Sequence, residues 1–265
     1  MSSYLGLFKM SFKGELQYRA KALSGVVTQV FWGLMYIYLY TAFMGGNIIE
    51  GFSISQMISY VWIGQAFFAL RFADLPKNCA KEIDNGDVCY KFVRPVDLYN
   101  QWFAEHFGYK FAATIIRCVP LAIVAFLMPK SMRLMLPTSV LSFTLFLVAL
   151  IIGALMMSAI SMITVFLTFK TLSAKGTLTF CNTVCGVLGG LYVPLVFMPQ
   201  SVQNVLNYLP FRFIMDLPAR IYIGNIPPMQ ALTFIGIALA WLIVLIAIGK
   251  LLIVKAGKNA VIQGG

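Results

Sequence analysis

The chain has 265 residues, of which 60% are apolar and only 11% are charged. A soluble domain carries about 25% charged residues, so this composition excludes an ordinary soluble protein and indicates a membrane protein. The net charge is +11, but the cations lie at the ends of apolar segments rather than on one exposed face. That placement is typical of membrane topology and contact with anionic lipid, and we expect no nucleic-acid partner.

The first predicted element is a helix over residues 4–20. Leu5, Phe8, Phe12 and Leu16 recur at three- and four-residue spacing, and the cations of this stretch fall largely away from them. This pattern predicts an amphipathic helix that lies in the inner membrane interface. The alternative is a frayed basic tail.

Six apolar segments follow, each a candidate for the roughly 20 residues that cross a bilayer. They are 23–44, 54–71, 107–128, 138–168, 177–197 and 231–251. With the N-terminus inside, fifteen of the 20 Lys and Arg lie on the inner side and four on the outer side. This bias predicts that both termini are cytoplasmic. Segment 138–168 would form a helix of roughly 46 Å, so we expect one long span that is tilted or protrudes from the bilayer.

The inner connection over residues 74–105 is dense in charge and turn signals. Pro76 favours a short helix that runs towards Asp84, and Asn85-Gly86 favours a left-handed stop. Asp97 is a plausible N-cap for the next span. A short helix held between two span ends suits contact with a soluble partner; the alternative is a long solvated loop.

The outer connection over residues 198–230 is unusually apolar and is interrupted by five prolines. We expect short helices that dip into the membrane and return, with protein covering their backbone.

Sites for chemistry are scarce in this sequence. The one histidine, His106, has no accompanying G-x-S-x-G motif, and we expect it to be an interfacial residue. The chain lacks a G-x-x-x-x-G-K-[ST] motif, so ATP binding by a P-loop of its own is excluded. The five cysteines indicate neither a disulfide framework nor a metal site. We therefore expect no enzyme activity and no bound cofactor or metal.

Arg117 lies about ten residues into the third predicted span. A cation at membrane depth is costly and usually faces protein or water. It is a candidate for the substrate path, where it would meet an anionic group or pair across a subunit interface. The alternatives are a side chain that reaches an inner water pocket, or a span that starts later in the sequence.

Two groups of motifs resemble type-2 ABC transporter permeases, in the subgroup of paired six-span subunits. The inner group comprises Glu82-Ile83-Asp84-Asn85-Gly86-Asp87, Arg94-Pro95-Val96-Asp97-Leu98-Tyr99 and Ala104-Glu105-His106. The outer group comprises Leu209-Pro210-Phe211-Arg212, Leu217-Pro218-Ala219 and Ile221-Tyr222-Ile223-Gly224. In layout the likeness extends over nearly the whole chain.

The resemblance implies a division of labour between chains. Two permease subunits, identical or related as a heterodimer, would face each other above two cytoplasmic ABC ATPase subunits that bind ATP and Mg. The loop helix would be the coupling helix, with mixed-sign contacts from Lys77, Lys81, Glu82, Asp84 and Asp87. The outer segment would match re-entrant helices that close the exit side, with gate candidates Pro210, Phe211, Pro218 and Tyr222.

The sequence therefore predicts an all-α membrane protein with six spans, in a single transmembrane domain over 1–265. We expect the permease subunit of an ATP-driven exporter in the cytoplasmic membrane of a prokaryote. Its cargo would be apolar or amphiphilic (a drug, a lipid-like molecule or a hydrophobic peptide), because the spans hold few fixed polar groups. The alternative is a membrane-embedded substrate-capture or scaffold subunit, which would need no coupling helix of its own.

Overall fold

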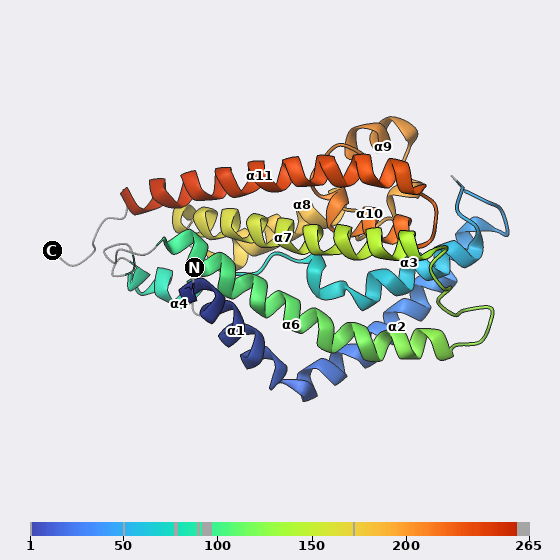
Figure 1. Cartoon of the computed structure of the whole chain (residues 1–265), viewed down its shortest axis with the longest axis horizontal. Helices are drawn as coiled ribbons and strands as arrows, with labels where there is room; N and C mark the ends of the chain where they lie inside the picture. The colour runs from blue at the N-terminus through green and yellow to red at the C-terminus, as the bar shows by residue number, and fades with distance from the viewer. Residues whose placement is uncertain are drawn as a thin grey trace.

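The computed structural model describes residues 2–49, 51–76, 79–88, 91, 97–171 and 173–258, and within them the fold is helical. The long helices α6 (Leu98–Leu127), α7 (Val140–Thr171) and α11 (Pro228–Lys258) run side by side along the long axis (Figure 1). Helix α2 (Arg19–Met44) crosses the bundle obliquely. In the described part of the chain, these four helices alone are long and apolar enough to span a membrane.

Helix α7 is the centre of the bundle. It packs against α6, α8 (Ala174–Leu188), α10 (Arg212–Tyr222) and α11. Most of its residues are buried, including Ser158, Ser161 and Thr164. Ser158 and Thr164 donate to backbone carbonyls one turn earlier, which satisfies hydroxyls that would otherwise be costly to bury. The predicted segment 138–168 is thus a single continuous helix of 32 residues.

Two of the six predicted segments form helices that are too short to cross a bilayer alone. Helix α3 (Ile54–Ala66) has 13 residues and continues into a 3₁₀ turn, η1 (Phe68–Arg71). Helix α8 has 15 residues and ends at Gly189 and Gly190, where Gly190 has φ +76°. At 1.5 Å per residue these helices are about 20 and 22 Å long, against about 30 Å of hydrocarbon.

The N-terminal helix α1 (Ser2–Leu16) forms where residues 4–20 predict one, and it packs along the first half of α6. Phe8 lies against Phe107, with ring centroids 5.7 Å apart, and Phe12 lies against Phe111. A Cβ atom at Gly108 would come 2.5 Å from the Phe8 carbonyl oxygen. The absence of a side chain at this position therefore permits the close approach of the two helices.

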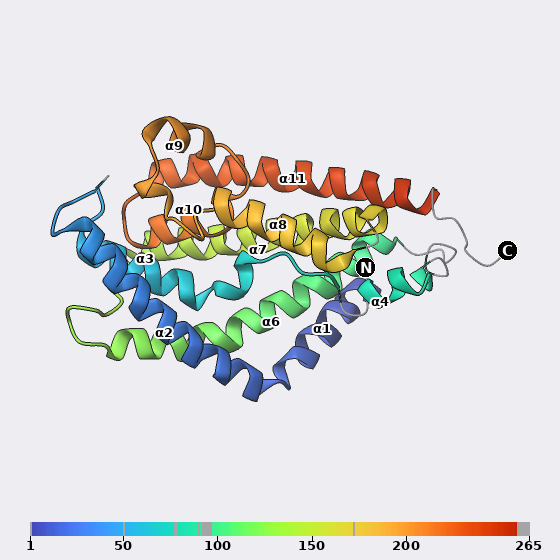
Figure 2. The same cartoon turned by 180° about the vertical axis from the view of Figure 1, so that it is seen from behind.

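The two ends of the bundle carry different short elements (Figures 1 and 2). Helix α4 (Cys79–Asp84) lies at the end where α6 begins and α7 finishes. The turn η2 (Leu195–Phe197), helix α9 (Gln200–Leu206) and helix α10 precede α11, and α9 and α10 lie near the opposite end. Helix α10 is wedged against α7: a Cβ atom at Gly153 would lie 2.5 Å from the Ile214 carbonyl oxygen.

Candidate functional site at the helix break before α4

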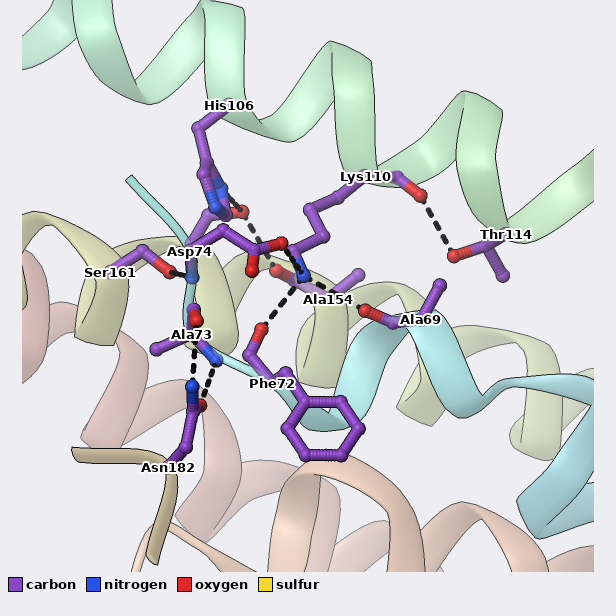
Figure 3. Close-up of polar contacts among 11 residues, drawn as sticks. Ala69, Phe72, Ala73, Asp74, His106, Lys110, Thr114, Ala154, Ser161 and Asn182 are labelled. Carbon is purple, nitrogen blue, oxygen red and sulfur yellow. Dashed lines mark hydrogen bonds and ion pairs between the residues drawn. The ribbon is translucent and has the colours of Figure 1, made fainter. Parts of the chain in front are cut away.

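The chain between α3 and α4 leaves the helical conformation inside the bundle. After η1, residues Phe72 to Pro76 are neither helix nor strand, so the backbone N–H and C=O groups of residues 72–75 are not part of a helical hydrogen-bond ladder. A buried backbone group without a partner is costly, and more so in hydrocarbon. The side chains that satisfy these groups define the site (Figure 3).

Lys110 of α6 binds this segment from one side. Its Nζ donates to the carbonyl oxygens of Ala69 at 2.9 Å and Phe72 at 2.7 Å. It also forms an ion pair with Asp74 Oδ2 at 2.5 Å. The Lys110 side chain is only 3% exposed, and these three acceptors use all three protons of its ammonium group. Lys110 thus joins the unwound segment to α6 (Figure 3).

Helices α7 and α8 bind the same segment from other sides. The side-chain amide of Asn182 in α8 accepts from the Ala73 N–H at 2.7 Å and donates to the Ala73 carbonyl at 3.2 Å. Ser161 of α7 accepts from the Asp74 N–H at 3.3 Å. Three helices therefore fix residues 72–74 through polar contacts (Figure 3).

Helix α4 follows directly and packs on its own small hydrophobic cluster. Cys79, Ile83 and Val88 are buried against residues of α6, α7 and α11, among them Trp102 and Val165. Burial raises the pKa of the Cys79 thiol to about 12, so this thiol belongs to the packing and is a poor nucleophile.

The turn signals of the loop are confirmed. Gly86, the second residue after α4, has φ +77°. Asp97 caps α6 by accepting from the Asn100 N–H at 3.1 Å.

The opposite end of the bundle holds a buried ionic cluster on α10. Asp216 is 1% exposed and lies 3.0 Å from Arg212 and 3.2 Å from Arg220, one turn to either side. Tyr60 of α3 donates to the same carboxylate at 2.9 Å. Burial alone would raise the pKa of Asp216, but the two arginines outweigh it and hold the pKa below its ordinary value.

With this geometry in view, comparison with known families gives a match over residues 30–264 to the ABC-2 family transporter protein model. The chain belongs to the ABC-2 transporter family. A comparison with curated proteins gives no match. Family membership makes this chain a non-catalytic transmembrane permease subunit and implies a separate ATPase partner.

In this ABC-2 subunit the predicted coupling residues fall only partly within the described structure. Lys77 lies outside the described residues, and so do the side chains of Lys81 and Asp84. Glu82 is paired with Lys91 at 2.7 Å, and Asp87 is exposed. The described structure therefore places one predicted carboxylate in an ion pair on α4 and one exposed just beyond the helix.

Arg117 is half-buried in α6, and its guanidinium lies against the backbone of α2. A Cβ atom at Gly25 would be 3.6 Å from Arg117 Nε. The described residues provide no ion pair or hydrogen bond to this guanidinium. Its role in the substrate path stays a prediction.

The four gate candidates are not brought together in one cluster. Pro210 and Phe211 precede α10, whereas Tyr222 ends it, about 16 Å further along the helix. Pro218 is buried within α10, and Tyr222 donates to the Met135 carbonyl at 3.1 Å. Their role as an outer gate stays a prediction.

Two polar residues of the site are buried inside the bundle. His106 is 1% exposed and contacts Ser158 of α7 at 3.1 Å, so its side chain lies inside the bundle. Its position at the membrane interface stays a prediction. Lys110 is one of the fifteen cations that the sequence places on the inner side, and its side chain is buried and donates to backbone carbonyls. The i,i+4 spacing of Arg212, Asp216 and Arg220 was a readable signal for the ionic cluster, whereas Lys110 had no local signal.

Proposed function

We propose that this ABC-2 subunit works as half of an exporter in which α4 is the coupling helix. Two permease subunits would face each other, with ATPase subunits docked below α4. Closure of the ATPase dimer would move α4, and the unwound residues 72–74 would carry that movement to α6, α7 and α8. The observation that supports this most strongly is the polar attachment of Ala73 and Asp74 to three helices.

Six crossings fit this proposal, with the two short helices completed by irregular chain. Helix α3, η1 and the extended residues to Pro76 together would make the second crossing. Helix α8 and the segment through η2 would make the fifth. Non-helical backbone at membrane depth is tolerated where protein covers it, and Lys110 and Asn182 provide such cover for residues 72–73.

On the outer side, α9 and α10 would be the re-entrant helices that close the exit. The buried cluster of Asp216 with Arg212, Arg220 and Tyr60 would hold α10 against α3 as one rigid unit. The cargo would be apolar or amphiphilic, moved outward, with Arg117 as its contact in the path.

The test is co-purification with the cognate ATPase, followed by ATP hydrolysis and transport assays in proteoliposomes across a panel of amphiphiles. The double variant Glu82→Gln/Asp87→Asn removes the α4 carboxylate that pairs with Lys91 and an exposed carboxylate just beyond α4. It leaves Cys79 and Ile83 of the buried face unchanged. We expect weaker ATPase association and loss of amphiphile-stimulated hydrolysis. Lys130→Met, at an exposed position between α6 and α7, is the matched control and should behave as the wild type.

The outcome that would overturn the proposal is equally specific. If no ATPase co-purifies, and deletion of residues 77–87 leaves function intact, the chain is a capture or scaffold subunit instead.

A further inference from the structure

A small pocket of about 20 Å³ lies between α2, α3, η1 and the turn that follows α8. A volume of this kind holds about one or two water molecules, or a polar group of similar size. Its polar side chains are Tyr36 and Tyr40 from α2, Tyr60 and Gln65 from α3, and Arg71 from η1. The pocket is thus polar, although the helices around it are mainly apolar.

Arg71 directs its guanidinium into the bundle. It ends η1, and its side chain turns back along α3 to Gly64, where an added Cβ atom would collide with Arg71 Nη2. Arg71 Nε is buried without a hydrogen-bond partner, and the described residues give this guanidinium no ion pair. Because a guanidinium stays protonated in proteins, a positive charge lies inside the bundle without a partner.

The neighbouring charges do not neutralise Arg71. Asp216 is the described carboxylate that acts on the Arg71 charge, but Arg212 and Arg220 already pair with it at 3.0 and 3.2 Å. Among the described residues, three arginines therefore share one aspartate; Glu50, in the loop before α3, lies outside them. Since an unpaired charge at membrane depth is costly, this excess of positive charge favours an anionic occupant.

Gln65 is a second polar group of the pocket without a partner. It is 4% exposed, and its Oε1 has no hydrogen-bond partner among the described residues. Rotation of the amide exchanges its oxygen with its NH₂ group, so Gln65 can present either an acceptor or a donor. A water molecule would satisfy this amide but would leave the charge of Arg71 unpaired. An anion accounts for both groups.

We propose that this pocket binds a carboxylate. The two oxygens of a carboxylate match the fork of a guanidinium, which donates two parallel N–H bonds to this planar group. A planar head also suits a pocket of about 20 Å³ better than a tetrahedral phosphate or sulfate does. A carbon chain attached to the carboxylate would leave past Tyr36 and Leu191, which line the pocket and are partly exposed.

Two probes of one length separate charge from apolar contact. Octanoate carries the carboxylate, and octanamide replaces it with a neutral group of similar shape. Titration calorimetry on the purified chain in lipid nanodiscs, corrected with empty nanodiscs for partition into lipid, should show saturable binding of octanoate. We expect octanamide to bind about tenfold more weakly, because it lacks the charge-assisted hydrogen bonds to Arg71.

Butyrate and chloride test the source and the selectivity. Butyrate binding as tight as octanoate binding would assign the site to a water-soluble acid, whereas tighter binding of octanoate would assign it to an amphiphilic one. Chloride should bind more weakly than butyrate, because a single atom cannot accept both N–H bonds of the fork in parallel.

Matched variants locate the site. Arg71→Met should weaken octanoate binding by about tenfold or more, whereas Arg133→Met, the same change of charge at an exposed position, should leave it unchanged. Arg71→Lys keeps the charge but not the fork, so we expect an intermediate affinity. Gly64→Ala keeps every charge but displaces Arg71 Nη2, so it should also weaken octanoate binding.

Thermal unfolding without octanoate checks that the variants fold. Arg71→Met removes a buried charge that lacks a partner, so its thermal midpoint should be no lower than that of the wild type. A lower midpoint would show that Arg71 also holds the fold, and the octanoate affinity of Gly64→Ala then decides whether the guanidinium binds the probe.

Equal affinity for octanoate and octanamide would overturn the proposal. So would octanoate binding that neither Arg71→Met nor Gly64→Ala weakens, chloride binding as tight as butyrate binding, or no saturable binding at millimolar concentration. These titrations involve neither the ATPase nor transport, so their failure leaves the proposed function to its own test.

Discussion

The two polar regions of this ABC-2 subunit, at the helix break and on α10, differ in the groups that their side chains bind. At the helix break, Lys110, Asn182 and Ser161 come from three helices and bind backbone atoms of residues 69–74. On α10, by contrast, side chains bind side chains, and three of the four lie one turn apart on the same helix. The first arrangement holds a non-helical stretch of chain to several neighbours, and the second joins side chains within one helix and to α3.

This difference has a mechanical consequence. A segment without helical hydrogen bonds changes its backbone angles at little cost once a side-chain contact gives way, whereas a helix with its charges paired moves as a block. We therefore expect the backbone angles of residues 72–74 to change when α4 moves, whereas α10 should be displaced as a rigid helix. The following predictions, from the largest effect to the smallest, test this comparison.

Loss of the central carboxylate of the outer cluster should have the largest effect. Asp216→Leu leaves Arg212 and Arg220 buried without their partner, and removing one partner of a buried ion pair costs about 3–5 kcal/mol. Chemical denaturation in mild detergent measures the free energy of unfolding. Asp216→Asn keeps an acceptor oxygen and should lose less; equal stability of Asp216→Leu and wild type would show that the cluster is not structural.

Lys110→Met should come next, with a loss of about 3 kcal/mol, because two carbonyls lose their donor in a buried place. Asp74→Asn is the matched partner variant. Its side chain is 41% exposed, so we expect a loss of less than about 1 kcal/mol. If both variants lose the same free energy, the Lys110–Asp74 ion pair, and not the backbone contacts, holds the segment.

Gly108→Ala should destabilise the chain by about 1–3 kcal/mol, because a Cβ atom there meets the backbone of α1. Gly14→Ala is the control, since an added Cβ at that position has no atom within 4 Å. Thermal unfolding and the rate of protease cleavage near residues 16–19 measure the result. Faster cleavage only in Gly108→Ala would show that α1 has been displaced from α6.

The last prediction concerns the reactivity of the Cys79 thiol in α4 when no ATPase is present, and it involves no loss of stability. With a pKa of about 12, Cys79 should react with N-ethylmaleimide at pH 8 at least tenfold more slowly than a cysteine placed at the exposed position 87. Mass spectrometry of the Asp87→Cys variant compares both thiols in one chain. Equal rates would show that α4 leaves its hydrophobic cluster without any ATPase present.

Much of this architecture follows from local sequence. Long apolar runs predict α2, α6, α7 and α11. Asp97 marks the start of α6, and Gly86 marks the stop after α4. The break after α3 was not predictable in this way. Residues 54–70 are mostly apolar and carry no charge before Arg71. The side chains that stabilise the unwound chain come from positions 110, 161 and 182. Such distant partners leave no periodic trace in the segment that they hold.

The candidate site was also only partly predictable from the sequence. The position of the coupling loop followed from charge, turn signals and a family resemblance, but the burial of His106 and Lys110 followed from neither. Both residues read locally as polar groups near a span end, and only their contacts with α7 and the unwound segment reveal their roles.

Photocrosslinking from position 87 tests the central claim most directly. A photoreactive amino acid replaces Asp87 in the assembled transporter, and the same residue replaces Lys130 as the matched control. We expect an adduct between position 87 and the ATPase whose yield changes when ATP closes the nucleotide-binding dimer, and no adduct from position 130. An adduct yield at position 87 no greater than at position 130 would contradict the assignment of α4 as the coupling helix.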